Sequence, residues 1–240
     1  QARLLSSLGY NLVLVARSET KINDLKDSLR DAPVEVQGVV ADAGALAPDE
    51  ILSKVVSGRN VTILIHNAAA GPRGTFFDQS FEDHLTAVDV NAKGVVAFAH
   101  TLGRLFKERR SGSMILMSSI VGHVGIAQWA TYAGTKAFIT KLAQGMAFEA
   151  KEYNVQVGAC VAGATTTPPY LKAVPADERV SLAEQQASDV VRECWNGLGS
   201  QTTVISGWPS RIMALLARLL PADVTTAIVS SNLNDVSSRG

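Results

Sequence analysis

Tyr132, Lys136 and Ser119 are the residues whose types and spacing could do chemistry. Tyr132 and Lys136 stand four residues apart in a helical pattern that begins near Trp129. Their side chains are therefore expected on one helix face, with Cβ atoms about 5–6 Å apart. Ser119 follows the apolar run Met114–Met117, which predicts a short buried strand. A phenol, an ammonium and a strand-end hydroxyl could thus converge on one small volume.

Such a trio suits proton transfer to or from a carbonyl or alcohol oxygen. A free tyrosine has a pKa of about 10, too high for efficient proton transfer near neutral pH. Lowering that pKa by about three units requires about 4 kcal/mol, which one unit charge about 4 Å away supplies at an effective dielectric near 20. We therefore expect Lys136 to lower the pKa of Tyr132. Taken alone, a Tyr-Lys pair at this spacing also fits a solvated pair on a helix surface.

The longer pattern resembles the short-chain dehydrogenase/reductase family. Ser119 precedes Tyr132 by 13 residues, and small residues surround Tyr132 and Lys136, as in that family's serine and Y-x-x-x-K motifs. Val90-Asn91-Ala92-Lys93-Gly94 resembles its segment in which an asparagine kinks a helix and anchors a water to the lysine. The resemblance runs from the first residue to at least Thr167.

The resemblance implies a role for each of these side chains. Tyr132 would donate the proton during reduction, and Lys136 would also hold the nicotinamide ribose. Ser119 would orient the carbonyl, and Asn91 would support a proton relay.

Two strand ends resemble dinucleotide-binding positions of the family, because ligands bind at the carboxyl ends of such strands. The segment Asn67, Ala68, Ala69 resembles the N-A-G motif, with alanine in place of the glycine and with His66 in place of a common asparagine. Asp42 resembles the strand-end aspartate beside the adenine. Its alternative role is a helix or turn cap.

Arg17 directly follows the predicted strand Asn11–Ala16. In NAD-preferring relatives an acid usually stands near Ala16 and binds the ribose hydroxyls. A small residue followed by a cation instead implies a pocket for the 2′-phosphate of NADP, with NAD the less favoured cofactor. An exposed surface arginine is the alternative.

The segment after the predicted strand Val155–Val161 resembles the family's P-G-x-x-x-T segment at the nicotinamide, with Ala162 replacing the proline. Gly163, Thr165 and Thr167 are the implied contacts. Residues 169–182 are expected to form a substrate loop and residues 208–221 a C-terminal helix. That helix could cap the pocket, pack on a partner or touch a membrane, but packing in the core is favoured.

The family opens with a strand and a T-G-x-x-x-G-x-G turn that receives the pyrophosphate on a helix N-terminus. No such turn precedes Gln1, so we expect this sequence to lack that strand and turn, roughly 20 residues. The missing strand would lie between the predicted strands Asn11–Ala16 and Val61–Ile65. If another segment fills that place, the run Thr225–Ser230 is the first candidate.

Apolar runs alternate with amphipathic segments along the chain, which predicts βαβ units and a parallel sheet. We expect one α/β domain over residues 1–240, a Rossmann-like doubly wound sheet in three α/β/α layers. The predicted strands are Asn11–Ala16, Val34–Val40, Val61–Ile65, Met114–Met117, Val155–Val161 and Thr202–Ile205. The stretches Phe81–Val90 and Ala92–Arg110 are expected to form two helices joined near Asn91.

Composition excludes several classes of function. The 22 basic and 22 acidic residues balance, which argues against a nucleic-acid binder or a polybasic membrane binder. No run of about 18 apolar residues predicts a membrane span, and we expect a cytoplasmic protein. The four histidines and two cysteines show no metal-ligand spacing. Cys160 and Cys194 are expected to be small core residues rather than a disulfide framework.

These observations predict an NADP-preferring oxidoreductase that interconverts a ketone and a secondary alcohol. Its substrate is expected to be a small ketone or alcohol, lipid-like or acyl in character. The alternatives are a non-catalytic binding scaffold or truncated fragment of the family, and a 3-oxoacyl thioester reductase. Charged residues make up 18% of the chain, below the usual share of about 25%, which favours burial in a sheet or between the subunits of a homodimer or homotetramer.

Overall fold

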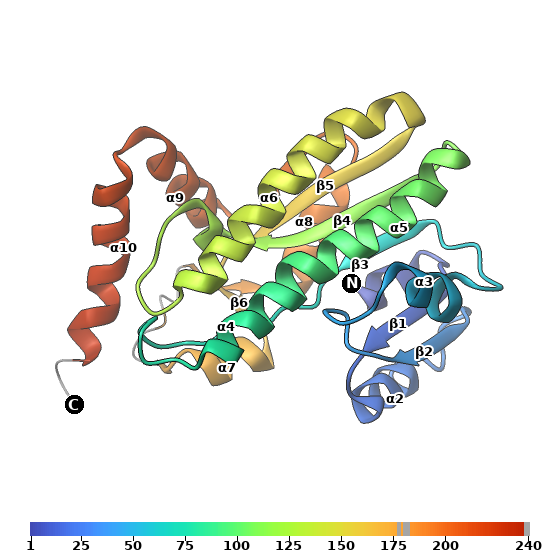
Figure 1. Ribbon diagram of the computed structural model, residues 1–240, viewed down its shortest axis with the longest axis horizontal. Coiled ribbons are helices and arrows are strands. Elements are labelled where there is room, and N and C mark those ends of the chain that lie inside the picture. The colour runs from blue at the N-terminus through green and yellow to red at the C-terminus, as the bar shows by residue number, and fades with distance from the viewer. Residues whose placement is uncertain (177–178, 180–182, 238–240) are drawn as a thin grey trace.

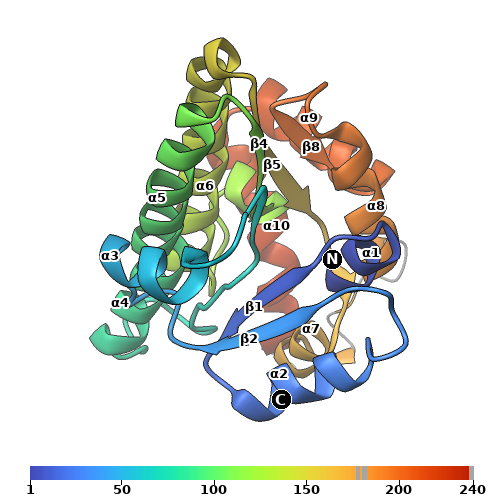
Figure 2. The ribbon, with the colours of Figure 1, turned by 90° about the vertical axis from the view of Figure 1, so that its right-hand side faces the viewer.

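The computed structural model describes residues 1–176, 179 and 183–237 of the 240-residue chain. Strands and helices alternate along it, and helices pack on both faces of a parallel sheet (Figures 1 and 2). The strands are β1 Leu12–Ala16, β2 Val36–Val40, β3 Ile63–His66, β4 Gly112–Ser119, β5 Val155–Ala162, β6 Thr165–Thr166, β7 Gln185–Gln186 and β8 Thr203–Ile205. The α-helices are α1 Ala2–Ser7, α2 Glu19–Asp27, α3 Pro48–Ile51, α4 Phe81–Val88, α5 Gly94–Glu108, α6 Ala130–Ala150, α7 Pro168–Ala173, α8 Ala187–Gly197, α9 Trp208–Leu219 and α10 Ala222–Ser237. The predicted Rossmann-like α/β fold is confirmed.

The larger sheet has the strand order β3-β4-β5-β8, with every pair parallel. Side chains of β4 alternate between its two faces. Met114 and Leu116 enter the main apolar core with α5 and α6, whereas Ile115 packs in a second cluster with α8. Both faces of β4 are therefore covered by helices, which explains why the run Met114–Met117 is apolar throughout.

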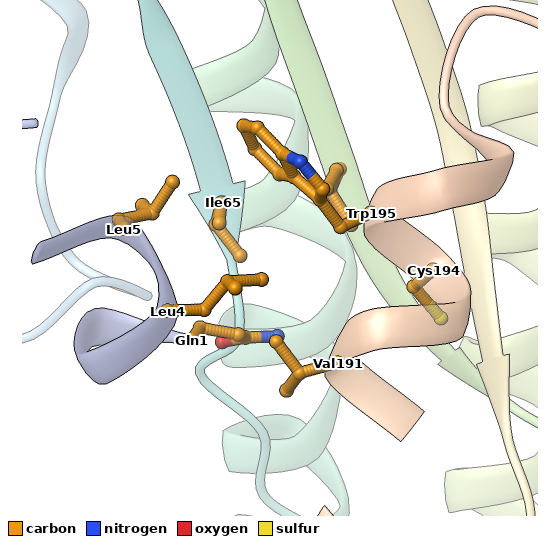
Figure 3. A pocket seen from close by; sticks show the side chains of 8 residues that line it. Gln1, Leu4, Leu5, Ile65, Val191, Cys194 and Trp195 are labelled. Carbon is orange, nitrogen blue, oxygen red and sulfur yellow. The ribbon is translucent and has the colours of Figure 1, made fainter. Parts of the chain in front are cut away.

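Strands β1 and β2 form a separate parallel pair. Among the described residues, no strand pairs with the second edge of β1 or with the free edge of β3. Leu4 and Leu5 of α1 instead line a small cavity with Ile65 of β3 and Trp195 of α8 (Figure 3). The run Thr225–Ser230 does not form the strand considered as a candidate, because it lies within α10.

The C-terminal helices depart from expectation. The expected helix over residues 208–221 is present as α9. The prediction that its apolar face packs in the core is wrong, because Leu215 is 55% exposed and Leu219 is 70% exposed. α10 runs along one side of the molecule (Figure 1) and contacts the segment before α6, where the Ala127 N–H donates to Ser230 Oγ at 3.0 Å. In the described part of the chain, no helix is both long and apolar enough to cross a membrane.

The expected substrate loop begins with a helix. Thr167 caps α7 by accepting a hydrogen bond from the Tyr170 N–H at 3.4 Å, and two prolines fill its first positions, where a missing N–H costs nothing. Residues 177–178 and 180–182 of that segment lie outside the described residues. α8 begins at Ala187, after β7 has paired with β6.

Cys160 of β5 and Cys194 of α8 are both buried, as expected, but they are joined by a disulfide. The prediction that they are separate core residues is wrong. Cys160 points to the sheet face that α8 covers, and the two Cα atoms lie 5.5 Å apart. The 34 residues between them conceal this proximity in the sequence.

Candidate active site

The end of β4 and the start of α6 bring Ser119 and Tyr132 together. Ser119 is the last residue of β4 and pairs in register with Ala162 of β5. A 3-10 turn, Ile120–His123, then brings the chain back toward α6. A Cβ on Gly122 would lie 2.7 Å from the main-chain N of Ala137, so only glycine permits this close approach.

Strand β4 and helix α6 are fastened to each other beside the site. The buried Ser118 hydroxyl lies 2.7 Å from the Lys136 carbonyl oxygen and 2.7 Å from Thr140 Oγ1. In return, Lys136 Nζ donates to the Met117 carbonyl oxygen at 2.9 Å. These bonds fix the distance between α6 and the end of β4.

Lys136 and Tyr132 share one helix face, as their spacing predicts. The ammonium lies 5.5 Å from the centre of the Tyr132 ring. The Lys136 side chain is almost fully buried, and burial lowers its pKa to about 8. The site therefore holds a cation in an apolar setting, where its charge acts more strongly than it would in water.

The pKa of Tyr132 does not move in the expected direction. Burial of the phenol raises its pKa, because it disfavours the charged phenolate, and a hydrogen bond with Ser119 opposes that effect only in part. The Lys136 ammonium donates to the Met117 carbonyl rather than to the phenol oxygen. The expectation that Lys136 lowers the pKa of Tyr132 is thus not met by this arrangement.

Asn91 lies in a π-helical turn, Asp89–Lys93, which joins α4 to α5 where the sequence predicts a junction. It is fully buried. Its amide nitrogen donates to the Ala70 carbonyl at 2.6 Å and to Thr135 Oγ1 at 2.9 Å, and its amide oxygen accepts from the Ala70 N–H at 2.9 Å. Asn91 thereby ties the loop after β3 to α6, one residue from Lys136.

His66, the last residue of β3, is 5% exposed and lies edge-on to Phe98 of α5, with ring centres 5.7 Å apart. Neither ring nitrogen has a hydrogen-bond partner among the described residues. Burial first, and then the charge of Lys136, lower the pKa of His66 to about 4. A neutral imidazole therefore stands within electrostatic reach of Lys136.

The residues expected at the adenosine end of a cofactor lie together. Arg17 follows β1, Asp42 follows β2, and Arg17 Nη1 is 3.9 Å from Asp42 Oδ2. The Arg17 side chain is 66% exposed. Asp42 Oδ1 also accepts the Gly44 N–H at 2.9 Å, so Asp42 caps a turn as its alternative role suggests.

Two further groups of expected cofactor contacts follow β3 and β5 at the carboxyl edge of the larger sheet, and those after β5 are the ones expected near the nicotinamide. Asn67 and Ala69 are exposed and Ala68 is half-buried, which leaves a small-residue surface against which a flat group could lie. Thr165 Oγ1 donates to the Gly163 carbonyl at 3.0 Å, and the Thr167 hydroxyl caps α7. Both threonine hydroxyls are thus engaged in hydrogen bonds within this segment.

Three positioning groups were missed from the sequence. Ser118 and Thr135 are buried hydroxyls that bridge elements of the site. The only sign of this role in the sequence is that Ser118 directly precedes Ser119 and Thr135 directly precedes Lys136. His84, which has no metal-ligand spacing in the sequence, contacts Thr131, the residue before Tyr132.

The geometry can therefore hold a carbonyl or alcohol oxygen between a serine hydroxyl and a phenol, beside a buried ammonium. Residues 1–178 match the family model for short chain dehydrogenase, and this chain belongs to that family. It is an NAD(P)-dependent oxidoreductase that acts on CH–OH groups, which favours an enzyme over a non-catalytic scaffold.

The chain is similar in sequence to known relatives and similar in fold to solved structures. A 7beta-hydroxysteroid dehydrogenase from Mediterraneibacter gnavus is 28% identical over 209 residues, which cover 85% of this chain and 79% of the relative. A solved structure described for 7beta-hydroxysteroid dehydrogenase stereoselectivity has a TM-score of 0.85 at 24% identity, over 94% of this chain and 89% of that one. A short-chain dehydrogenase from Sphingobium yanoikuyae in complex with NADPH has a TM-score of 0.78 at 24% identity, over 91% and 87%.

Proposed function

We propose that this protein interconverts a ketone and a secondary alcohol, with NADP as its preferred cofactor. The observation that carries the proposal is the convergence of the Ser119 hydroxyl and the Tyr132 phenol beside the buried Lys136 ammonium. The similarity to hydroxysteroid dehydrogenases supports a secondary alcohol on a large apolar molecule.

Each site residue takes one task in the proposed reaction. The bound cofactor supplies the hydride. Tyr132 donates its proton to the substrate oxygen during reduction, and Ser119 holds that oxygen beside the phenol. The positive charge of Lys136 stabilises the phenolate that forms when the proton leaves.

Asn91, Arg17 and Asp42 complete the proposed assignment. Asn91 keeps the loop after β3 in place against α6 and supports the return of a proton to Tyr132. Arg17 would pair with the 2′-phosphate of NADP, since its guanidinium is exposed beyond β1. Asp42 would lie beside the adenine, and the remaining cofactor contacts are those proposed after β3 and β5.

The test of the mechanism is Tyr132→Phe in folded protein, assayed with NADPH and a panel of ketones that includes a 3-oxoacyl thioester. Turnover should fall by about 10²- to 10⁴-fold, because positioned proton transfer is worth that much, while NADPH binding stays unchanged. Tyr153→Phe is the matched control, since Tyr153 lies outside the site beside Lys107. Near wild-type turnover in Tyr132→Phe would refute the proposed role.

We further infer that an additional strand, followed by a glycine-rich turn for the pyrophosphate, belongs between β1 and β3. The support is that, among the described residues, β1 and β3 each pair with a strand on one edge only. Each unsatisfied buried main-chain group costs about 1–3 kcal/mol, so five or six would match the roughly 5–15 kcal/mol stability of a domain.

Expression with and without upstream residues tests this inference. Residues 1–240 alone should be insoluble or molten and should bind no dinucleotide, while the extended chain should melt cooperatively and quench NADPH fluorescence. Cooperative melting and stoichiometric NADPH binding by residues 1–240 alone would contradict it.

A further inference from the structure

Residues 71–80, which connect β3 to α4, form a wall of the site that we name the aromatic loop. A Cβ on Gly71 would come within 2.9 Å of Tyr132 Cδ2. The main chain of the loop therefore packs directly on the phenol ring.

The aromatic loop is fastened to several elements. Ala70, just before it, is held by the Asn91 side chain. The Gly74 N–H donates to the Gln128 carbonyl at 3.0 Å, in the segment before α6. Arg73 Nη1 donates to the Ala173 carbonyl at 2.6 Å, at the end of α7. The loop is thus positioned by the same parts of the fold that surround the site.

His84 of α4 makes a further connection. Its Nε2 lies 3.0 Å from the Phe76 carbonyl oxygen, which can only accept a hydrogen bond, so Nε2 carries the proton. Nδ1 then accepts from Thr131 Oγ1 at 2.8 Å. The same ring stacks on Phe76, with ring centres 4.5 Å apart. His84 therefore joins the aromatic loop to the residue that immediately precedes Tyr132.

The loop presents two large apolar side chains to solvent. Phe76 is 51% exposed and Phe77 is 93% exposed, and their rings meet edge to face at 5.5 Å. Exposed apolar patches commonly mark binding surfaces. An aromatic pair on a fastened loop beside a catalytic tyrosine is suited to an apolar ligand.

We propose that Phe76 and Phe77 form an apolar shelf that binds the hydrocarbon part of the substrate, and that His84 positions this shelf relative to Tyr132. The substrate class is a ketone or secondary alcohol that carries a large apolar ring or chain. This proposal rests on the proposed function and specifies its substrate. Tyr132 and Ser119 hold the oxygen, and the shelf holds the carbon skeleton.

Cyclohexanone and 2-decalone test the shelf, because the second ring is the main difference between them. Phe77→Ala should lower kcat/KM for 2-decalone about tenfold more than for cyclohexanone, mainly through KM. Phe148→Ala is the matched control, since Phe148 is 76% exposed near the far end of α6, and it should leave the ratio unchanged. An unchanged ratio in Phe77→Ala would overturn the proposal.

Two substitutions at His84 separate positioning from general loss of structure. His84→Leu removes both hydrogen bonds and should lower the 2-decalone to cyclohexanone ratio. His84→Gln keeps a donor for the Phe76 carbonyl and an acceptor for the Thr131 hydroxyl, and it should restore most of that ratio. Equal ratios in the two variants would overturn the role of His84.

Calorimetric binding of 2-decalone provides a readout that does not depend on turnover. Binding that is about tenfold weaker in Phe77→Ala supports the shelf, whether or not the protein reduces any ketone. Absence of ketone reduction would refute only the proposed function. Unchanged binding overturns the shelf. A change in sedimentation of Phe77→Ala without a change in binding also overturns it, because Phe77 would then contact a second copy of the chain.

Discussion

Replacing His66 with asparagine should remove a specific part of the acid sensitivity of this protein. The His66 ring is buried against Phe98 and under the influence of Lys136, and its pKa is lowered from 6.5 to about 4. In the unfolded chain the ring takes up a proton near pH 6.5. Between these two values the unfolded state binds more protons than the folded state, so the free energy of unfolding falls as the pH falls.

The size of the effect follows from the two pKa values. At 1.36 kcal/mol per pKa unit, the full loss is about 3 kcal/mol, reached near pH 4, and about 2 kcal/mol of it has occurred by pH 5. Above about pH 7 the ring is neutral in both states and contributes no pH dependence. A loss of this size is a large fraction of the stability of a typical domain.

Urea unfolding of the extended chain that melts cooperatively, followed by circular dichroism at pH 7, 6, 5 and 4.5, measures the effect. His66→Asn changes packing at every pH, so the quantity to compare is the change in unfolding free energy between pH 7 and pH 5. That change should be about 2 kcal/mol smaller in His66→Asn than in the wild type, whereas His100→Asn, an exposed control, should match the wild type. If the wild type and His66→Asn lose stability equally, His66 is not the buried neutral group described above.

Three further predictions concern the cofactor, the disulfide and the contact between strand and helix. The wild type should prefer NADPH to NADH by about ten- to a hundred-fold, since a charge-assisted hydrogen bond contributes about 1.5–3 kcal/mol, and Arg17→Asp should reverse the order; equal ratios of kcat/KM in the two proteins would exclude that contact. Reducing the Cys160–Cys194 disulfide with dithiothreitol should lower the free energy of unfolding, measured by urea titration, by about 2–4 kcal/mol, given the 34-residue separation. In the control, a variant with alanine at both positions, dithiothreitol should change nothing. Ser118→Ala removes the contacts of this hydroxyl with the Lys136 carbonyl and with Thr140, while Thr140 still donates to the Lys136 carbonyl at 3.2 Å, so the free energy of unfolding should fall by about 0.5–1.5 kcal/mol; a thermal shift below the resolution of calorimetry would argue against the fastening role.

Much of the fold could be predicted because its signals are local. The apolar runs predict the strands within two residues at most ends, and the spacing of Tyr132 and Lys136 places both on one face of α6. The capping signal of α7 was also present, with Thr167 followed by two prolines, but the expectation of a substrate loop obscured it.

The features that could not be predicted depend on tertiary contacts. The Cys160–Cys194 bond joins a strand to a helix that no periodicity places opposite it. The direction of the Tyr132 pKa depends on how deeply the phenol is buried, which the Tyr-Lys spacing does not reveal. The apolar face of α9 shows a helical period, but the sequence does not indicate that little of the described chain covers it.

The buried lysine makes the catalytic centre a weak point of the fold. Holding an ammonium whose pKa is lowered from 10.5 to about 8 costs about 3 kcal/mol below that pH. An apolar residue of similar length at position 136 would remove that cost and would lose one hydrogen bond, from Lys136 Nζ to the Met117 carbonyl oxygen, worth about 0.5–1.5 kcal/mol. Selection for thermal resistance alone would therefore favour loss of the lysine, so its retention in a stabilised variant would indicate that the chemistry was also under selection.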